Sequence, residues 1–114
     1  MNTGIHLLVE GHTLMRFTQP YLVRFQEDLV EAVGMRVIHG PNVVGGPKNW
    51  YGITILAESH TTLHVAGDTV WLDLFSCTWY DHKPALELMI NRLKLTSVNH
   101  HVIKRKMPSP IGVT

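Results

Sequence analysis

The stretch YGITILAESHTTLHVAGDTVWLDLFSC, residues 51–77, decides the fold class. It contains three segments rich in β-branched and aromatic residues, at 51–59, 61–67 and 69–77, and this composition is typical of β-strands. The third segment alternates, with Val70, Leu72 and Leu74 on one face and Trp71, Asp73, Phe75 and Cys77 on the other. This half of the chain therefore predicts a sheet whose strands are mostly antiparallel.

Two amphipathic helices are predicted on either side of this segment. Thr18 can cap the first helix, which has Pro20 in its first turn and ends at Gly34. Its apolar residues recur at helical spacing: Leu22, Phe25, Leu29 and Val33. Pro84 opens the second helix, whose apolar stripe comprises Ala85, Met89 and Leu93.

The rest of the chain supplies further strands and the connections between elements. Strands are predicted at 4–11, 35–40 and 96–106, loops at 41–49 and 78–82, and a loose tail at 107–114. The order is therefore strand, helix, strands, helix, strand. It predicts an α+β fold, a two-layer sandwich with both helices packed on one face of a mostly antiparallel sheet. We expect a single domain, 1–114, because 114 residues leave little room for two.

One face of such a sheet has no helix to cover it. Trp71 and Phe75 belong to this face, opposite the core-facing residues of the same strand. An exposed apolar sheet face is normally buried by another layer. We therefore expect a homodimer formed through this face.

Composition narrows the class of protein. Hydrophobic residues make up 45% of the chain and charged residues 17%, and the net charge of +1 offers no basic field for nucleic acid. No apolar run approaches the ~20 residues of a membrane span, and the N-terminus does not resemble a signal peptide. We therefore expect a cytoplasmic protein with no nucleic-acid or membrane partner. The single cysteine, Cys77, excludes an intrachain disulfide, and a lone cysteine in an apolar strand is most often a small buried hydrophobe.

The junction AESHTTLH, residues 57–64, interrupts the strands without the Gly, Pro, Asn or Asp typical of turns. If the chain turns tightly here, the Ser59 hydroxyl can attack the carbonyl carbon of Glu58 in an N-to-O acyl shift, assisted by backbone strain. A base that then removes the α-proton of residue 59 breaks the chain at the ester. The dehydroalanine that remains hydrolyses to a pyruvoyl group, whose ketone can form a Schiff base with a substrate amine.

The segment ESHTTLH (58–64), followed by WLDLFSC (71–77), resembles the self-processing core of prokaryotic S-adenosylmethionine decarboxylases. IHLLVEG (5–11) also looks like the first strand of that family, and the similarity extends over residues 4–105. The resemblance implies cleavage between Glu58 and Ser59 into fragments 1–58 and 59–114. It implies a pyruvoyl cofactor derived from Ser59, and decarboxylation of S-adenosylmethionine for polyamine biosynthesis.

The resemblance also implies roles for individual residues. His64 would help remove the α-proton during processing, and Cys77 would return a proton to the substrate carbon after carbon dioxide leaves. Glu10 occupies the position of an acidic residue that contacts substrate in the family. The family fold, two helices over an antiparallel sheet with active sites at a dimer interface, agrees with the pattern described above.

Three positions depart from the family pattern. Tyr51 replaces a serine that supports processing, and its phenol reaches further than a serine hydroxyl. Gly45 falls where the family has an aromatic residue stacked on adenine, so either neighbouring Trp50 takes this role or the adenine site is altered or absent. Thr78 replaces a glycine after the cysteine. These changes leave the substrate open between S-adenosylmethionine and a smaller cationic amino acid, arginine or ornithine.

Two other interpretations remain open. His60, His64 and Cys77 together could bind zinc, since His60 and His64 share a strand face and zinc accepts nitrogen and sulfur ligands. Alternatively, the chain is a family homologue that does not process itself and binds a ligand or a protein partner. Tyr51 and Gly45 favour this second alternative, whereas the intact set of Ser59, His64 and Cys77 favours the enzyme.

Overall fold

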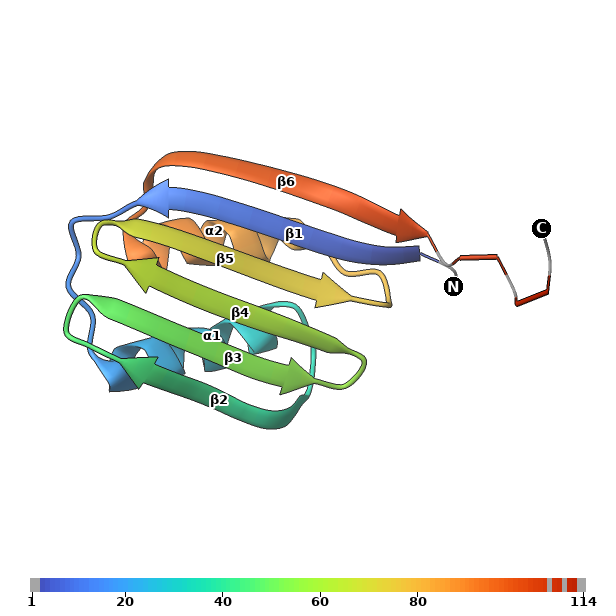
Figure 1. The fold of residues 1–114 in the computed structure, drawn as a ribbon, viewed down its shortest axis with the longest axis horizontal. Coiled ribbons are helices and arrows are strands. Elements are labelled where there is room, and N and C mark those ends of the chain that lie inside the picture. The colour runs from blue at the N-terminus through green and yellow to red at the C-terminus, as the bar shows by residue number, and fades with distance from the viewer. Residues whose placement is uncertain (1–2, 107, 110, 113–114) are drawn as a thin grey trace.

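Within the part of the chain that the structure describes, one antiparallel sheet carries both helices on the same face (Figure 1). The structure is a computed structural model, and it describes residues 3–106, 108–109 and 111–112. The elements in chain order are β1 (Thr3–His12), α1 (Gln19–Ala32), β2 (Val37–Gly45), β3 (Asn49–Leu56), β4 (Ser59–Ala66), β5 (Thr69–Ser76), α2 (His82–Leu93) and β6 (Thr96–Lys106). The strands lie in the order β2-β3-β4-β5-β1-β6, and every neighbouring pair is antiparallel. The predicted α+β two-layer sandwich is confirmed.

The helices begin where side-chain caps satisfy their free N–H groups. The Thr18 hydroxyl accepts a hydrogen bond from the backbone N–H of Tyr21 at 3.4 Å, as the sequence predicted for α1. Asp81 does the same for α2, where its carboxylate accepts from the N–H of Lys83 at 3.1 Å. The prediction that residues 78–82 are all loop was therefore wrong at its end, because α2 begins at His82 rather than at Pro84.

The predicted loop 41–49 was also wrong over much of its length. β2 continues to Gly45 and β3 begins at Asn49, so only 46–48 connects them. β2 is an edge strand, and an edge strand accommodates proline because one side of its backbone has no partner. The irregular register of β2 between His39 and Asn42 takes up the disturbance around Pro41.

The core lies between the helices and the helix-facing side of the sheet. Leu22, Phe25 and Leu29 of α1 are fully buried against it, as are Met89 and Leu93 of α2. Asp28 of α1 joins the two helices by accepting a 2.7 Å hydrogen bond from the guanidinium of Arg92. This bond lowers the pKa of the Asp28 carboxyl against the smaller opposing effect of burial.

The two edges of the sheet differ in length and charge. β2 forms one edge with its irregular register, and β6 forms the other with eleven residues that pair only with β1. β6 ends in three consecutive cations: Lys104, Arg105 and Lys106.

Neither described helix has the length and apolar character needed to cross a membrane. Of the predicted tail 107–114, positions 107, 110, 113 and 114 lie outside the described residues.

Candidate active site

The turn between β3 and β4 is a tight hairpin of two residues, Ala57 and Glu58. Leu56 pairs directly with Ser59 across it, so the predicted junction falls at the tip of the hairpin. Glu58 has a φ of 63°, in the left-handed region where residues other than glycine are strained. Strain of this kind costs on the order of 1–3 kcal/mol. The strained residue, Glu58, is the one whose carbonyl carbon the Ser59 hydroxyl would attack.

Ser59 starts β4 with its side chain on the helix-facing side of the sheet. It is only 9% exposed, and its hydroxyl has no hydrogen-bond partner within the described chain. A buried hydroxyl without a partner is uncommon, because desolvating it is unfavourable. Ser76 of β5 lies directly across from Ser59, and the Ser76 hydroxyl is engaged with Thr78 through two hydrogen bonds. The Ser59 hydroxyl is thus left free beside the Glu58 carbonyl.

Cys77 lies one residue beyond β5 and is bonded to Glu58 at two points. Its backbone N–H donates to the Glu58 carbonyl oxygen at 3.3 Å, and its thiol donates to Glu58 Oε2 at 3.5 Å. The interpretation of Cys77 as a buried hydrophobe is wrong, because the residue is exposed. Desolvation raises the pKa of the Cys77 thiol, and the hydrogen bond to Glu58 and its negative charge raise it further.

On the other face of the sheet, which we call the open face, side chains form three rows across β3, β4, β5, β1 and β6. Cross-strand partners share a face, so the rows follow from the register. The row nearest the β3–β4 turn is Ile55, His60, Phe75, His6 and Ile103. The middle row is Ile53, Thr62, Asp73, Leu8 and His101. The far row is Tyr51, His64, Trp71, Glu10 and Asn99.

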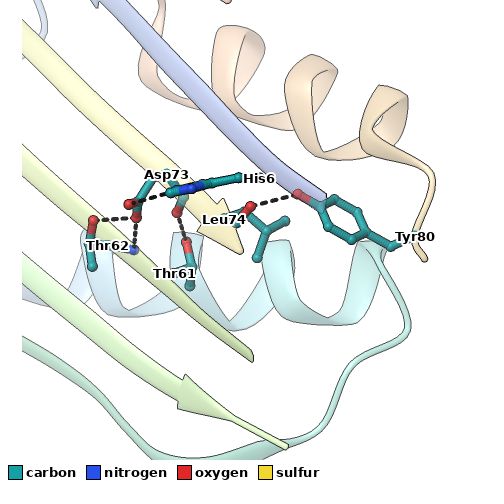
Figure 2. A network of polar contacts seen from close by, with 6 residues as sticks. All are labelled: His6, Thr61, Thr62, Asp73, Leu74 and Tyr80. Atoms are coloured by element: carbon teal, nitrogen blue, oxygen red, sulfur yellow. Dashed lines mark hydrogen bonds and ion pairs between the residues drawn. The ribbon is translucent and has the colours of Figure 1, made fainter. Parts of the chain in front are cut away.

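A network of polar contacts centred on Asp73 joins the middle row to the row nearest the turn (Figure 2). Asp73 Oδ1 accepts from the backbone N–H of Thr62 at 3.1 Å and from the Thr62 hydroxyl at 2.5 Å. Its other carboxylate oxygen lies 3.2 Å from Nε2 of His6. Both carboxylate oxygens of Asp73 therefore contact other residues of the chain, and these contacts link β4, β5 and β1 on the open face.

A pocket of about 170 Å³ lies between the middle and far rows. Glu10, His64 and Trp71 line it together with Thr62 and Asp73. The side chain of Glu10 makes no hydrogen bond or ion pair with another residue that the structure describes, in contrast to that of Asp73. The pocket thus offers a free carboxylate, an imidazole and an indole to a ligand.

The structure does not bring His64 to Ser59 within one chain. The two residues are five positions apart on β4, and an odd separation puts their side chains on opposite faces of a strand. Five residues of extended strand also span about 16 Å. The predicted site residues therefore form two groups, with Glu58, Ser59 and Cys77 at the turn, and Glu10 and His64 in the open-face pocket together with neighbouring Tyr51.

Trp50 belongs to neither group. Its indole is 7% exposed and lies on the helix-facing side, where its Nε1 has no partner among the described residues. Gly46 lies against the Trp50 ring, since a Cβ added to it would come within 2.8 Å of the indole. The substrate-stacking role assigned to Trp50 from sequence thus has no exposed ring face to support it.

Sequence reasoning gave no site role to Ser76, Thr62, Trp71 or Asp73. The alternation of residues 69–77 had already placed Trp71 and Asp73 on the open face. The charged side chain of Asp73 inside an otherwise apolar strand could have indicated a polar site there. Nothing in the sequence marked Ser76, because its position opposite Ser59 depends on the register of β4 with β5.

Regarding the zinc alternative, no group of three potential ligands is found in the described part of the chain, although His60 and His64 do share the open face.

Comparison with known proteins places this chain in a family. The model of one family, described as S-adenosylmethionine decarboxylase, matches residues 6–106. Among solved structures, the adenosylmethionine decarboxylase from Aquifex aeolicus VF5 has a similar fold, with a TM-score of 0.77 and 16% sequence identity. The match covers 99% of this chain and 98% of that one. No curated protein sequence matches the chain.

The contact between Glu58 and Cys77 predicts how the thiol titrates. In a Ser59→Ala background, which keeps the junction intact, Glu58→Gln removes the negative charge that helps raise the Cys77 pKa. A lower pKa gives more thiolate at pH 8, so iodoacetamide should alkylate this single cysteine several-fold faster. The rate should be measured from pH 6 to 10. Glu27→Gln, at an exposed position of α1, is the control, and equal rates for Glu58→Gln and its parent would contradict the assignment.

Proposed function

This chain belongs to the S-adenosylmethionine decarboxylase family, and we propose that it is a pyruvoyl-dependent decarboxylase that cleaves itself between Glu58 and Ser59. One observation carries the proposal. The buried, unpartnered hydroxyl of Ser59 follows directly after Glu58, whose backbone is strained and whose carbonyl oxygen accepts the Cys77 N–H. A nucleophile, a strained acceptor and a donor for the developing oxyanion thus meet at one peptide bond.

All three features support the first step of the cleavage, the N-to-O acyl shift. As Ser59 Oγ bonds to the carbonyl carbon of Glu58, negative charge develops on the carbonyl oxygen, where the Cys77 N–H would stabilise it. The C–N bond then breaks, the nitrogen of residue 59 takes up a proton, and an ester joins the two halves. Loss of the α-proton of residue 59 expels the Glu58 carboxylate, and water converts the remaining dehydroalanine into a pyruvoyl group with release of ammonia.

The residues around the junction also suit the later reaction. The pyruvoyl group would supply a ketone that withdraws electrons from the substrate carbon as its carboxyl group leaves. Cys77 would then protonate that carbon. Because partial desolvation of the thiol and the adjacent Glu58 carboxylate raise the pKa of Cys77, the thiol stays protonated at neutral pH, as a proton donor requires.

His64 can approach the backbone of residue 59, from which it would remove the α-proton, if it comes from a second copy of the chain. We propose a dimer in which two open faces pack together around a two-fold axis perpendicular to the strands. Such an axis reverses the order of the rows, so the far row of one copy, with His64 and Glu10, lies over the turn end of the other. The exposed apolar residues of the open face support this packing, since Ile53, Ile55, Trp71 and Ile103 are each between 42% and 46% exposed.

Glu10 would contribute to substrate binding from the same row. Its free carboxylate lies beside the Trp71 indole in the pocket, and this pairing suits a cationic substrate. S-adenosylmethionine carries a sulfonium charge, and we propose it as the substrate because it is the substrate in the family's description. Arginine and ornithine are the alternatives, because Gly45 and the buried Trp50 leave no aromatic platform for adenine at that position.

Self-cleavage is tested by intact-mass spectrometry of the purified chain. We expect fragments 1–58 and 59–114, the second with a blocked, ketone-bearing start. Ser59→Ala should give one full-length mass, because the nucleophile is absent, whereas Ser109→Ala in the tail should cleave like the parent. A parent chain that stays full-length after long incubation would favour the alternative of a non-processing homologue, which the tyrosine at position 51 motivates.

The origin of His64 is tested by mixing two inactive variants. Ser59→Ala lacks the nucleophile and His64→Ala lacks the base, so each alone should cleave at least about 10²-fold more slowly than the parent. Co-expression should restore cleavage of the His64→Ala chains, because a Ser59→Ala partner supplies its histidine. Absence of fragments from a mixture that light scattering shows to be dimeric would refute this arrangement, and a monomeric parent would refute the dimer itself.

The substrate is identified by offering S-adenosylmethionine, arginine and ornithine, each labelled in the carboxyl group, and counting the released carbon dioxide. We expect release from S-adenosylmethionine, and release from arginine or ornithine alone would overturn this choice. Cys77→Ala should lower the amount of correctly protonated product relative to carbon dioxide, because the thiol acts after the carbon–carbon bond breaks. An unchanged ratio would remove Cys77 from this role.

A further inference from the structure

The imidazole of His64 is held between two aromatic rings on the open face. The Tyr51 ring is stacked on it, with centroids 4.7 Å apart and an interplanar angle of 25°. The Trp71 indole lies on its other side in the sheet, with centroids 5.2 Å apart and an interplanar angle of 34°. Both contacts follow from the register, because Tyr51 on β3 and Trp71 on β5 are the direct cross-strand partners of His64.

Tyr51 contacts the site through its ring and not through its hydroxyl. The side chain is 51% exposed, and its hydroxyl forms no hydrogen bond with any described residue. Among the residues that the structure describes, Tyr51 therefore meets the proposed base through its stacked ring alone.

Ring contacts on both sides restrict the imidazole. The terminal torsion of an unrestrained histidine is broad, so its ring nitrogens sample many directions. One stacked ring and one tilted ring at this distance leave the imidazole little room to rotate. A general base acts only when its nitrogen lies within hydrogen-bond reach of the proton that it removes.

We propose that Tyr51 and Trp71 are positioning residues that fix the orientation of the His64 imidazole through their ring contacts, one stacked and one tilted. Their effect on cleavage rests on the proposed function, whereas the restraint on the ring does not. Misplacing a reacting group by about 1 Å slows a reaction on the order of 10²-fold, so loss of one ring should slow self-cleavage without abolishing it.

The test separates the ring of Tyr51 from its hydroxyl. Tyr51→Phe keeps the ring and should cleave at the parent rate. Tyr51→Ser keeps a hydroxyl without the ring, and Tyr51→Leu keeps neither, so both should cleave about 10- to 100-fold more slowly. Trp71→Phe and Trp71→Leu form the equivalent pair on the other side of His64. Fast cleavage by Tyr51→Ser together with slow cleavage by Tyr51→Phe would overturn the proposal, because the hydroxyl would then be the active group.

A second measurement does not depend on cleavage. In a Ser59→Ala background, ring currents from Tyr51 and Trp71 should displace the carbon-bound imidazole proton resonances of His64. Tyr51→Phe should preserve these positions, whereas Tyr51→Leu and Tyr51→Ser should move them toward those of a free histidine. Unchanged resonances in Tyr51→Leu would overturn the proposal even if the parent cleaves. Displaced resonances in a parent that never cleaves would confirm the restraint, but would refute its role in cleavage together with the proposed function.

The control variant is Leu14→Ala. Leu14 is an apolar residue, 88% exposed, in the connection between β1 and α1, and it belongs neither to the three rows of the open face nor to the cleavage junction. Its replacement should leave both the cleavage rate and the His64 resonances at parent values. Light scattering on all variants should give the parent size. If Leu14→Ala slows cleavage as much as Tyr51→Leu, the effect is not specific to the rings that contact His64 and the proposal is wrong.

Discussion

Successive side chains of β4 point to opposite faces of the sheet, and this alternation constrains everything else in the molecule. It turns Ser59, Leu63 and Val65 toward the helices, where burial stabilises the fold, and turns His60, Thr62 and His64 toward the open face. β5 repeats the division, with Leu72 and Leu74 inside and Trp71 and Asp73 outside. The sheet therefore separates the Ser59 hydroxyl from His64, the base proposed to remove the α-proton of residue 59. A second sheet on the open face would bring the His64 of a partner chain over the turn end, on the face away from that hydroxyl. The two-residue period of the strands thus decides which side chains are buried in the core, which lie at the proposed dimer contact and which take part in the proposed reaction.

The cleavage junction shows how ordinary sheet geometry can prepare a peptide bond for attack. The hairpin has glutamate where a glycine would relieve the positive φ, so the backbone stays strained next to the nucleophile. The same glutamate contacts Cys77 through its carbonyl and its carboxylate. One residue thus connects the acceptor of the proposed acyl shift with the thiol of the proposed decarboxylation.

The sequence was sufficient for features that depend on local periodicity. The alternation in 69–77 and the stripes of the two helices identified the two-layer sandwich, because each pattern reports which face is buried. Residues 41–45 were mistaken for a loop, since composition alone does not reveal that β2 is an edge strand able to accommodate proline. Cys77 was not expected to be exposed, because the end of β5 depends on a contact with the β3–β4 turn. Ser59 and His64 are close in sequence, which suggested that they are close in space. They are five residues apart on one strand, however, and an odd separation places their side chains on opposite faces.

The edges of the sheet govern how copies of this chain can add to one another. β2 is irregular around Pro41, and β6 ends in three cations, so a strand from another molecule would meet either a broken ladder or repelling charge. Edge-to-edge addition, the step that polymerises sheets into fibrils, is therefore disfavoured at both sides. The apolar open face is left as the surface for the proposed dimer, and a two-fold pairing there would bury it on both copies. Association of this kind would be self-limiting, because a pair would leave no second apolar face on which a further copy could add.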